Sequence, residues 1–252
     1  MQTTFATIAV HQQIAEITLN DPSKRNALGL KMFDELDAAI ASLASNMEVH
    51  VALLRGEGSV FCAGFDLAAA AGDPSQMAEF IMRLSEMNRR LRRLPHVVVA
   101  AVQGAAIAGG CAILSACDFV FAARDAKFGY PVHRIGVSPA VTIPTLQQAV
   151  GPGAARSLLM SGELIDAAAA HRIGLVSHLS ESGDTVLSDA RAHCTKLATK
   201  GPHALRATKA WLNEIDGSLN DAAFVGPARA SAEITQSAEA QALIATWNAK
   251  RP

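Results

Sequence analysis

Short apolar runs alternate with polar loops along the first part of the chain. The runs at 51–54, 97–102 and 119–122 predict buried strands, because short apolar segments bounded by turn residues favour sheets. The ranges 5–10 and 14–19 predict two more strands around a short polar link. Helical stretches separate the later strands, so the pattern predicts an α/β core.

Helical spacing marks the segments between and after these strands. Leucine, isoleucine and phenylalanine recur on one face of 30–43, which predicts a helix there. A second helix is predicted at 77–94, where arginines suit a helix C-terminus. No strand is predicted beyond residue 186, and the remaining chain predicts three helices, at 186–199, 204–215 and 221–249. We therefore expect an α/β core over 1–195 and a helical region over 196–252.

Two turns that contain glycine are the most informative segments. They are FCAGFDL at 61–67 and GAAIAGGC at 104–111, and each lies between an apolar run and a potential helix. A strand, a glycine turn and a helix start leave backbone N–H groups free at the turn. Two such turns that face each other can hold a developing oxyanion between two amides. The pattern thus predicts carbonyl chemistry that requires no catalytic side chain.

Composition narrows the class of protein. Of the 252 residues, 50% are hydrophobic and 18% charged, and the net charge of −1 gives no indication of a nucleic-acid or membrane partner. No apolar run reaches the roughly 18 residues that span a bilayer, and the N-terminus lacks signal-peptide features. The four cysteines show neither a CxxC pair nor metal-ligand spacing. We expect reduced, buried thiols, no metal and a cytoplasmic location.

The order of the short motifs resembles the crotonase superfamily, also called the enoyl-CoA hydratase/isomerase family. The resemblance covers nearly the whole chain and is carried by ITLNDP at 17–22, RNAL at 25–28, FCAGFDL at 61–67, AAVQG at 100–104, AGG at 108–110, AKFGYP at 126–131 and IGVSP at 135–139. It implies an α/β, crotonase-type spiral of repeated β-β-α units with a C-terminal helical trimerisation region. The assembly would be a homotrimer or a dimer of trimers. The substrate would be an acyl-CoA thioester, with coenzyme A as part of the substrate and no tightly bound cofactor.

The same resemblance assigns residues to the site. The oxyanion donors would be the backbone N–H groups of Phe65 and Gly109, and the missing Cβ of Gly109 lets a ligand oxygen approach its amide closely. Lys24 and Arg25 would lie near the nucleotide phosphates of coenzyme A, although solvated loop charges are an equal alternative. The groove for adenine and pantetheine would be lined by the backbones of Ala27, Ala63, Asp66 and Leu67, where Asp66 could instead cap the following helix.

The catalytic side chains of the family are missing. Hydratases of the family use two glutamates, and those positions here are Ala112 and Val132. The aspartate that dienoyl isomerases add falls at Ala140. These residues, together with Tyr130, are expected to line the substrate pocket. A positioned acid or base is worth about 100- to 10,000-fold in rate, so we expect weak or no hydration of crotonyl-CoA.

Three explanations for the missing glutamates stay open. Another residue could act as acid or base, and His133 and Glu86 are the candidates, although His133 should point away if Val132 points inward. The reaction could need no glutamate pair, as in decarboxylation or thioester hydrolysis. The chain could also bind acyl-CoA without turnover. The leading prediction is an enzyme of the lyase or isomerase class that stabilises a thioester enolate.

Overall fold

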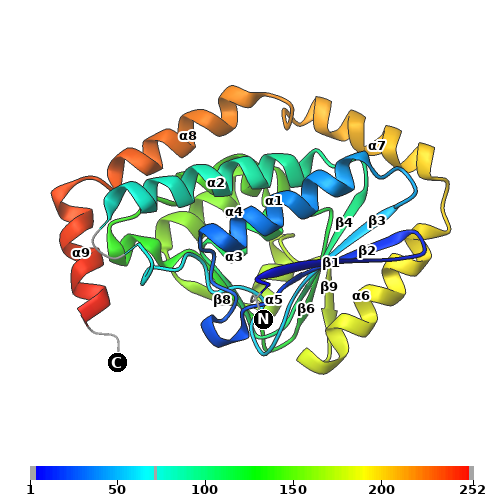
Figure 1. Ribbon diagram of the computed structural model, residues 1–252, viewed down its shortest axis with the longest axis horizontal. Helices are drawn as coiled ribbons and strands as arrows, with labels where there is room; N and C mark the ends of the chain where they lie inside the picture. Colours follow the sequence, from blue (N-terminus) through cyan, green and yellow to red (C-terminus); the bar gives the residue numbers. More distant parts are fainter. Residues whose placement is uncertain (1–3, 71–72, 250–252) are drawn as a thin grey trace.

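The computed structural model describes residues 4–70 and 73–249, which form layers of sheet and helix (Figure 1). The larger sheet has six strands in the order β1-β2-β3-β4-β6-β9. β1 pairs antiparallel with β2, and each further neighbouring pair is parallel. The strands are β1 (Ala6–His11), β2 (Ile14–Leu19), β3 (Val51–Gly56), β4 (Val97–Val102), β6 (Phe119–Ala123) and β9 (His178–Ser180).

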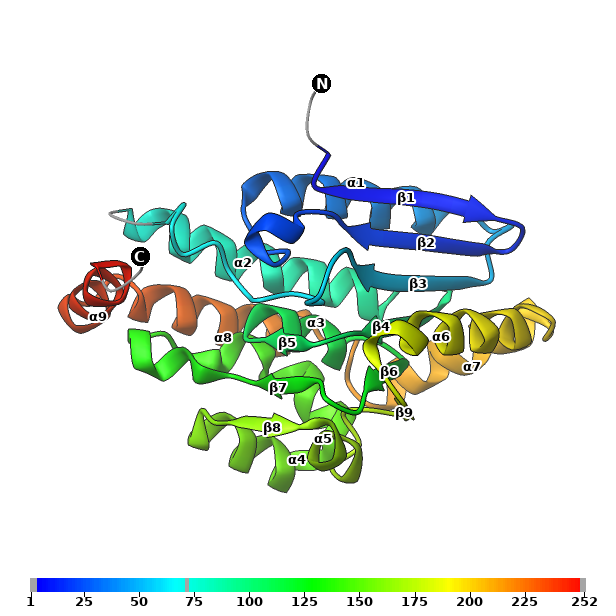
Figure 2. The same cartoon turned by 90° about the horizontal axis from the view of Figure 1, so that it is seen from below.

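A smaller sheet accompanies the larger one and creates the repeated units. It has the order β5-β7-β8, with β5 (Ala105–Ile107), β7 (Lys127–Gly129) and β8 (Leu164–Asp166). β4 leads directly into β5 and then α3 (Gly109–Ser115), while β6 leads into β7 and later α4 (Ile143–Ser161). Figure 2 shows the three short strands following one another through the molecule. The expected spiral of β-β-α units is therefore confirmed.

Helices cover both faces of the larger sheet. Successive side chains of a strand point to opposite faces, so both faces carry apolar side chains that pack against helices. Val51 and Leu53 pack toward α6 (Gly183–Ala198), whereas Ala52 and Leu54 face the core beneath α1 (Leu30–Ser45) and α2 (Pro74–Arg92). The remaining short helices are α5 (Ala167–Arg172), η1 (Pro22–Lys24), η2 (Pro131–Ile135) and η3 (Pro139–Thr142).

The C-terminal region is helical, as expected, but the single helix predicted at 221–249 is wrong. The structure has α7 (Pro202–Ile215), α8 (Asp221–Ile234) and α9 (Ala238–Ala249). The Ser237 hydroxyl accepts the N–H of Ala240 at 3.2 Å, so a local side-chain hydrogen bond begins a new helix. Figure 1 shows α8 running alongside α2. α9 packs on η2, where an added Cβ at Gly136 would lie 2.6 Å from the Ala240 Cα.

α7 turns polar side chains toward the protein. The Lys209 Nζ lies 2.6 Å from the Asp118 Oδ2 and donates to the His96 carbonyl at 2.9 Å. Burial lowers the pKa of Lys209 against the opposing effect of Asp118. The Asn213 amide donates to the Arg92 carbonyl at 3.1 Å. The opposite side of α7 exposes large apolar side chains, namely Trp211, Leu212 and Ile215.

Three further properties concern the described residues. No helix among them is both long and apolar enough to cross a bilayer. They also contain no group of three or more His, Cys, Asp or Glu that could hold a metal. All four cysteines are buried and unpaired, as predicted, and burial raises the pKa of Cys111 to about 11 and the pKa of the other three thiols to about 12.

Candidate active site

The two glycine turns lie against each other. The N–H groups of Phe61 and Cys62 donate to the Ala105 carbonyl at 3.1 and 3.3 Å, and the Ile107 N–H donates to the Cys62 carbonyl at 3.0 Å. A Cβ added at Gly110 would lie 2.4 Å from that carbonyl oxygen. Glycine at this position therefore permits the close approach of α3 to the first turn.

The backbone N–H of Phe65 points away from the segment around Leu28, with which Phe65 pairs. Leu28 forms a parallel bridge with Phe65, in which the Leu28 N–H donates to the Gly64 carbonyl at 2.7 Å and the Asp66 N–H donates to the Leu28 carbonyl at 3.0 Å. Alternation along an extended segment then turns the Phe65 N–H to the other side. Within the described residues, this N–H donates to no backbone carbonyl.

An aromatic cluster holds Phe65 in place. Its ring centroid lies 6.4 Å from that of Phe33 on α1 and 5.7 Å from that of Phe80 on α2. Phe33 and Phe80 also contact each other, with centroids 6.1 Å apart. Tilted rings at these separations attract beyond simple burial. The side chain of Phe65 is thus anchored between two helices, which positions its amide.

Ala108 sets the direction of the second free amide. Its φ of 49° and ψ of −111° lie outside the usual regions for a residue with a Cβ. Its own N–H donates to the Gly129 carbonyl at 2.8 Å, which holds this conformation. Gly109 follows as the first residue of α3, and a Cβ added at Gly64 would lie 3.5 Å from the Gly109 nitrogen. The Gly109 N–H has no backbone acceptor in the described chain.

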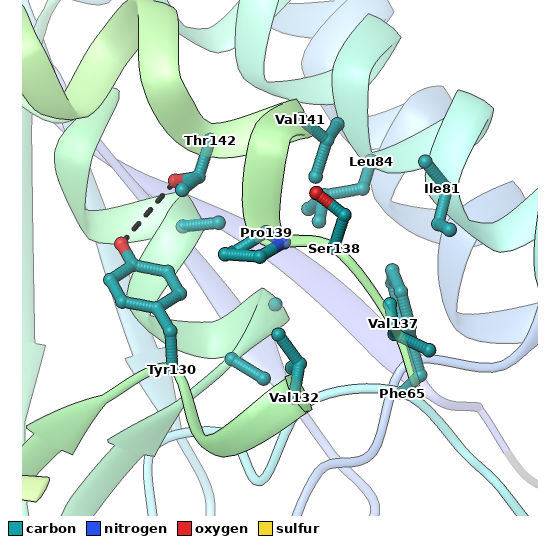
Figure 3. A pocket seen from close by; sticks show the side chains of 13 residues that line it. Phe65, Ile81, Leu84, Tyr130, Val132, Val137, Ser138, Pro139, Val141 and Thr142 are labelled. Carbon is teal, nitrogen blue, oxygen red and sulfur yellow. Dashed lines mark hydrogen bonds between the residues drawn. The ribbon is translucent and has the colours of Figure 1, made fainter. Parts of the chain in front are cut away.

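Phe65 and Gly109 both line one small cavity. Its volume is about 20 Å³, enough for about one water. Figure 3 shows Tyr130 and Thr142 at one side and Phe65 and Ile81 at the other. Ala140 is half-buried and is not among the residues that line the cavity. The lining consists of Phe65, Ile81, Leu84, Ala108, Gly109, Ala112, Tyr130, Val132, Val137, Ser138, Pro139, Val141 and Thr142.

The cavity lining has hydroxyl groups but no carboxylate or imidazole among the described residues. The Tyr130 hydroxyl lies 3.3 Å from the Thr142 Oγ1. Burial is the main reason that the pKa of Tyr130 lies well above its usual value of 10. Ala112 and Val132 line the cavity, as the sequence suggested. Among the lining side chains, we therefore find no group that changes charge near neutral pH.

The two acid–base candidates lie outside this cavity. Glu86 forms an ion pair with Arg89 on its own helix, and its side chain is 44% exposed. Helical spacing explains the difference, because Ile81 and Leu84 face the cavity from the same helix. His133 is exposed and lies beside Gly162, where an added Cβ would be 3.2 Å from its Nδ1. Neither residue is among those that line the cavity, and Pro131–Ile135 forms η2 instead of the extended chain from which His133 was expected to point away.

A larger groove of about 540 Å³ begins at Phe65, which lines both spaces. The Lys24 Nζ lies 2.7 Å from the Asp66 Oδ2, and this contact raises the pKa of Lys24. The Asp66 Oδ1 also accepts the Ala69 N–H at 3.2 Å, so this carboxylate combines an ion pair with a local turn contact. All six residues expected at coenzyme A line the groove. The complete lining is Ser23, Lys24, Arg25, Ala27, Ala63, Phe65, Asp66, Leu67, Ala68, Ile107 and Trp247.

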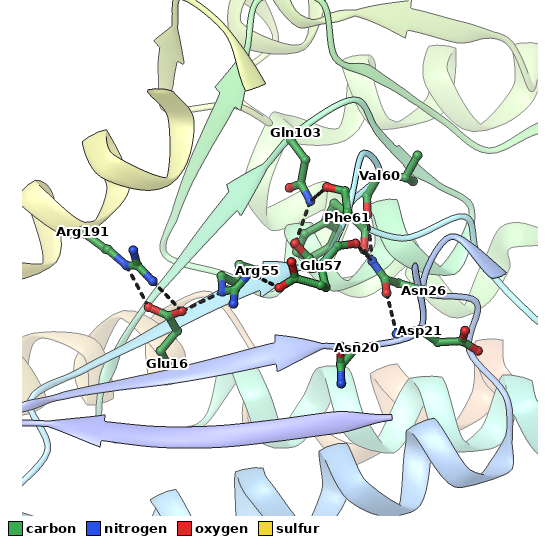
Figure 4. A network of polar contacts seen from close by, with 12 residues as sticks. Glu16, Asn20, Asp21, Asn26, Arg55, Glu57, Val60, Phe61, Gln103 and Arg191 are labelled. Carbon is green, nitrogen blue, oxygen red and sulfur yellow. Dashed lines mark hydrogen bonds and ion pairs between the residues drawn. The ribbon is translucent and has the colours of Figure 1, made fainter. Parts of the chain in front are cut away.

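The amide side chains of the buried Asn26 and the half-buried Gln103 hold the loops of this groove together (Figure 4). The Asn26 Nδ2 donates to the carbonyls of Glu57 and Val60 at 2.9 and 2.8 Å, and its Oδ1 accepts the Asp21 N–H at 2.9 Å. The Gln103 Nε2 donates to the Gly56 carbonyl at 2.7 Å. The loop that carries Lys24 and Arg25 is therefore fastened to the chain that leads to Phe65.

Sequence reasoning missed three contributors to the site. Asn26 belongs to a recognised motif, but its contacts depend on loops that are distant in sequence. Ala108 gives no local signal, because alanine rarely adopts a positive φ. Trp247 reaches the groove from α9, near the end of the described chain. Tryptophan in a helix usually indicates packing, so no sequence pattern predicts this position.

The β-β-α spiral with its helical C-terminal region defines a crotonase-type fold. The family profile described as enoyl-CoA hydratase/isomerase matches residues 9–250. A Thermus thermophilus protein provisionally named an enoyl-CoA hydratase is 34% identical over 243 residues, which cover 95% of this chain and 96% of that protein. The chain belongs to the enoyl-CoA hydratase/isomerase family, whose members are enzymes that act on coenzyme A thioesters.

Solved structures agree with this assignment. The crystal structure of an enoyl-CoA hydratase from Mycobacterium avium has a TM-score of 0.84 and 28% identity, and the match covers 99% of this chain and 98% of that one. An enoyl-CoA hydratase/isomerase from Xanthobacter autotrophicus Py2 matches over the full length of both chains, with a TM-score of 0.81 and 27% identity. The fold similarity thus extends through the helical C-terminal region.

Proposed function

We propose that this chain binds an acyl-CoA thioester and stabilises an enolate of its acyl group. The thioester oxygen would accept hydrogen bonds from the backbone N–H groups of Phe65 and Gly109. The supporting observation is that these two amides lack backbone acceptors in the described chain and belong to residues that line the same apolar cavity. Fixed donors in a site that excludes water stabilise developing negative charge strongly, and the loss of one donor costs about 3–4 kcal/mol.

The coenzyme A part would occupy the groove that continues from Phe65. Lys24 and Arg25 would face the phosphates, while Ala27, Ala63 and Leu67 would border adenine and pantetheine. Asp66 neutralises part of the charge on Lys24, so its role would be to orient that ammonium group.

The reaction would differ from ordinary hydration. Hydration needs proton transfer to and from the substrate, and the described cavity lining contains no side chain suited to it near neutral pH. We expect crotonyl-CoA to bind and to be hydrated slowly or not at all.

Decarboxylation is the second candidate, because it needs no acid–base pair and the described cavity lining has hydroxyl groups but no such pair. In a β-carboxylated acyl thioester, the bond between the α carbon and the carboxyl carbon would break. Carbon dioxide would leave, the electron pair would pass to the thioester carbonyl as an enolate, and water would protonate the α carbon. An apolar cavity also disfavours the bound carboxylate relative to this product state.

The test is a binding and turnover panel on the full chain. Calorimetry with coenzyme A and butyryl-CoA should give binding of both, with tighter binding of the thioester. Lys24→Ala should weaken both, whereas Lys196→Ala, an exposed position on α6, should weaken neither. If neither coenzyme A nor butyryl-CoA binds, the proposed function is contradicted.

Chromatography would then follow crotonyl-CoA, methylmalonyl-CoA and butyryl-CoA for hydration, decarboxylation and hydrolysis. Loss of carbon dioxide from methylmalonyl-CoA would support the second candidate. Hydration as fast as in members with two glutamates would contradict the absence of a working base. Tight binding with no turnover of any substrate would instead favour an acyl-CoA-binding protein without catalysis.

We also propose assembly through the C-terminal helices as a trimer or a dimer of trimers. The support is the exposed apolar side of α7, with Trp211 at 67%, Leu212 at 59% and Ile215 at 82% exposure. Contiguous apolar surface of this kind is typical of protein contacts. Light scattering should give a trimer or larger for the native chain and a smaller species for Ile215→Asp. The cytoplasmic location, and the boundary near residue 195 between the α/β core and the helical region, stay predictions.

A further inference from the structure

Two neighbouring elements form walls of the acyl cavity, which is the small cavity lined by Phe65 and Gly109. α2 contributes Ile81 and Leu84, which are almost completely buried. The segment that contains η3 contacts α2 and contributes Ser138 and Val141, which Figure 3 labels together with Ile81 and Leu84. The distance between these walls decides how much acyl chain fits, because the cavity volume is only about 20 Å³.

α8 is bonded to both walls. The Ser231 hydroxyl donates to the Ser138 carbonyl at 3.0 Å and accepts the Val141 N–H at 3.2 Å. Ser231 is completely buried, so these two bonds do not compete with water. On the other wall, the Ser85 hydroxyl of α2 donates to the Phe224 carbonyl of α8 at 3.4 Å. A single helix thus connects the two sides of the cavity.

Ion pairs fix the end of α2 against the start of α8. Asp221 lies 3.0 Å from Arg89 and 2.7 Å from Arg93. Arg92 pairs with Asp216, just before α8, at 2.7 Å. Exposed pairs contribute little one by one, but this group joins α2 to the α7–α8 region at several points. Widening the cavity would therefore require α8 to shift as well as α2.

We infer that the acyl site, on the proposed function above, selects short-chain acyl thioesters, and that Ser231 is a positioning residue for this selection. The hydroxyl clamps η3 toward α2 and limits the depth of the cavity. An acyl group enters beside Phe65 and Gly109, and each added methylene would press further against the buried side chains of Leu84 and Val141. Overpacking an apolar site opposes binding.

The test measures dissociation constants for coenzyme A, acetyl-CoA, butyryl-CoA and octanoyl-CoA by calorimetry. In the native protein, butyryl-CoA should bind more tightly than coenzyme A, and octanoyl-CoA should bind at least about tenfold more weakly than butyryl-CoA. In Leu84→Ala, which removes part of one wall, the ratio of octanoyl-CoA to butyryl-CoA affinity should rise about tenfold or more.

Ser231→Ala tests the clamp itself. It should raise the same affinity ratio by loosening η3, while the matched variant Thr235→Ala should not. Thr235 is also buried on the end of α8, but its hydroxyl donates to the Ala232 carbonyl of its own helix. A general loss of stability would affect both variants and all ligands alike, so the ratio distinguishes positioning from folding.

The outcomes separate the two proposals. If coenzyme A and butyryl-CoA do not bind, the proposed function fails. If both bind and octanoyl-CoA binds equally well in the native protein, the short-chain inference alone fails. If Leu84→Ala shifts the ratio but Ser231→Ala does not, the cavity limits chain length and the role of Ser231 is refuted.

Discussion

Replacement of Ala108 by glycine should stabilise this protein, although alanine-to-glycine changes usually destabilise. Ala108 has a φ of 49° and a ψ of −111° just before the second proposed oxyanion donor. Such backbone strain costs about 1–3 kcal/mol, and glycine would remove it. The greater freedom of glycine in the unfolded chain offsets about 0.5–1 kcal/mol of this gain in stability. We therefore expect Ala108→Gly to raise the free energy of unfolding by about 1 kcal/mol.

Urea denaturation, read by circular dichroism, measures this change. A gain of this size raises the melting temperature by about 2–4 °C in a chain of this length. The matched control is Ala207→Gly, an exposed position inside α7, which should lower the free energy of unfolding by about 1 kcal/mol. Equal destabilisation by both changes would refute the strain argument. We also expect Ala108→Gly to weaken butyryl-CoA binding, because a freer residue 108 orients the Gly109 amide less well.

Three other predictions concern the tail, the groove and the thiols. Lys209→Met should lower the free energy of unfolding in urea by about 3–5 kcal/mol, because Asp118 would lose its buried partner, and a loss under 1 kcal/mol would contradict this. Coenzyme A should change the fluorescence of the native protein and of Trp211→Phe but not of Trp247→Phe, because of the two tryptophans only Trp247 lines the groove. A fluorescence change that persists in Trp247→Phe would contradict this prediction. At pH 8 the cysteines should react with a thiol reagent only after unfolding. Burial raises the pKa of each thiol to about 11 or about 12, so the thiols stay protonated in the folded protein. A thiol that reacts rapidly in the native protein would contradict this prediction.

The larger sheet was mostly predictable from local patterns, whereas none of the short strands of the smaller sheet was predicted. The strand predicted at 14–19 is β2, and the periodicity from Leu30 to Leu43 lies within α1. Period and turn chemistry are properties of neighbouring residues, so the sequence carries them directly. The end of α8 was not predictable in this way, because neither glycine nor proline lies between Ile234 and Ala238, where the Ser237 hydroxyl accepts the Ala240 N–H and a new helix begins.

The candidate site divides along the same line. The sequence by itself predicted two glycine turns with free backbone N–H groups, since each turn follows from a strand, a glycine and a change of direction within a few residues. The resemblance to the family then assigned these groups to Phe65 and Gly109. Only the tertiary structure decided which side chains share the space beside them. It turned Ile81 and Leu84 inward and Glu86 outward, and it brought Trp247 to the groove. Contacts between distant segments depend on how whole helices pack, and no local spacing encodes that packing.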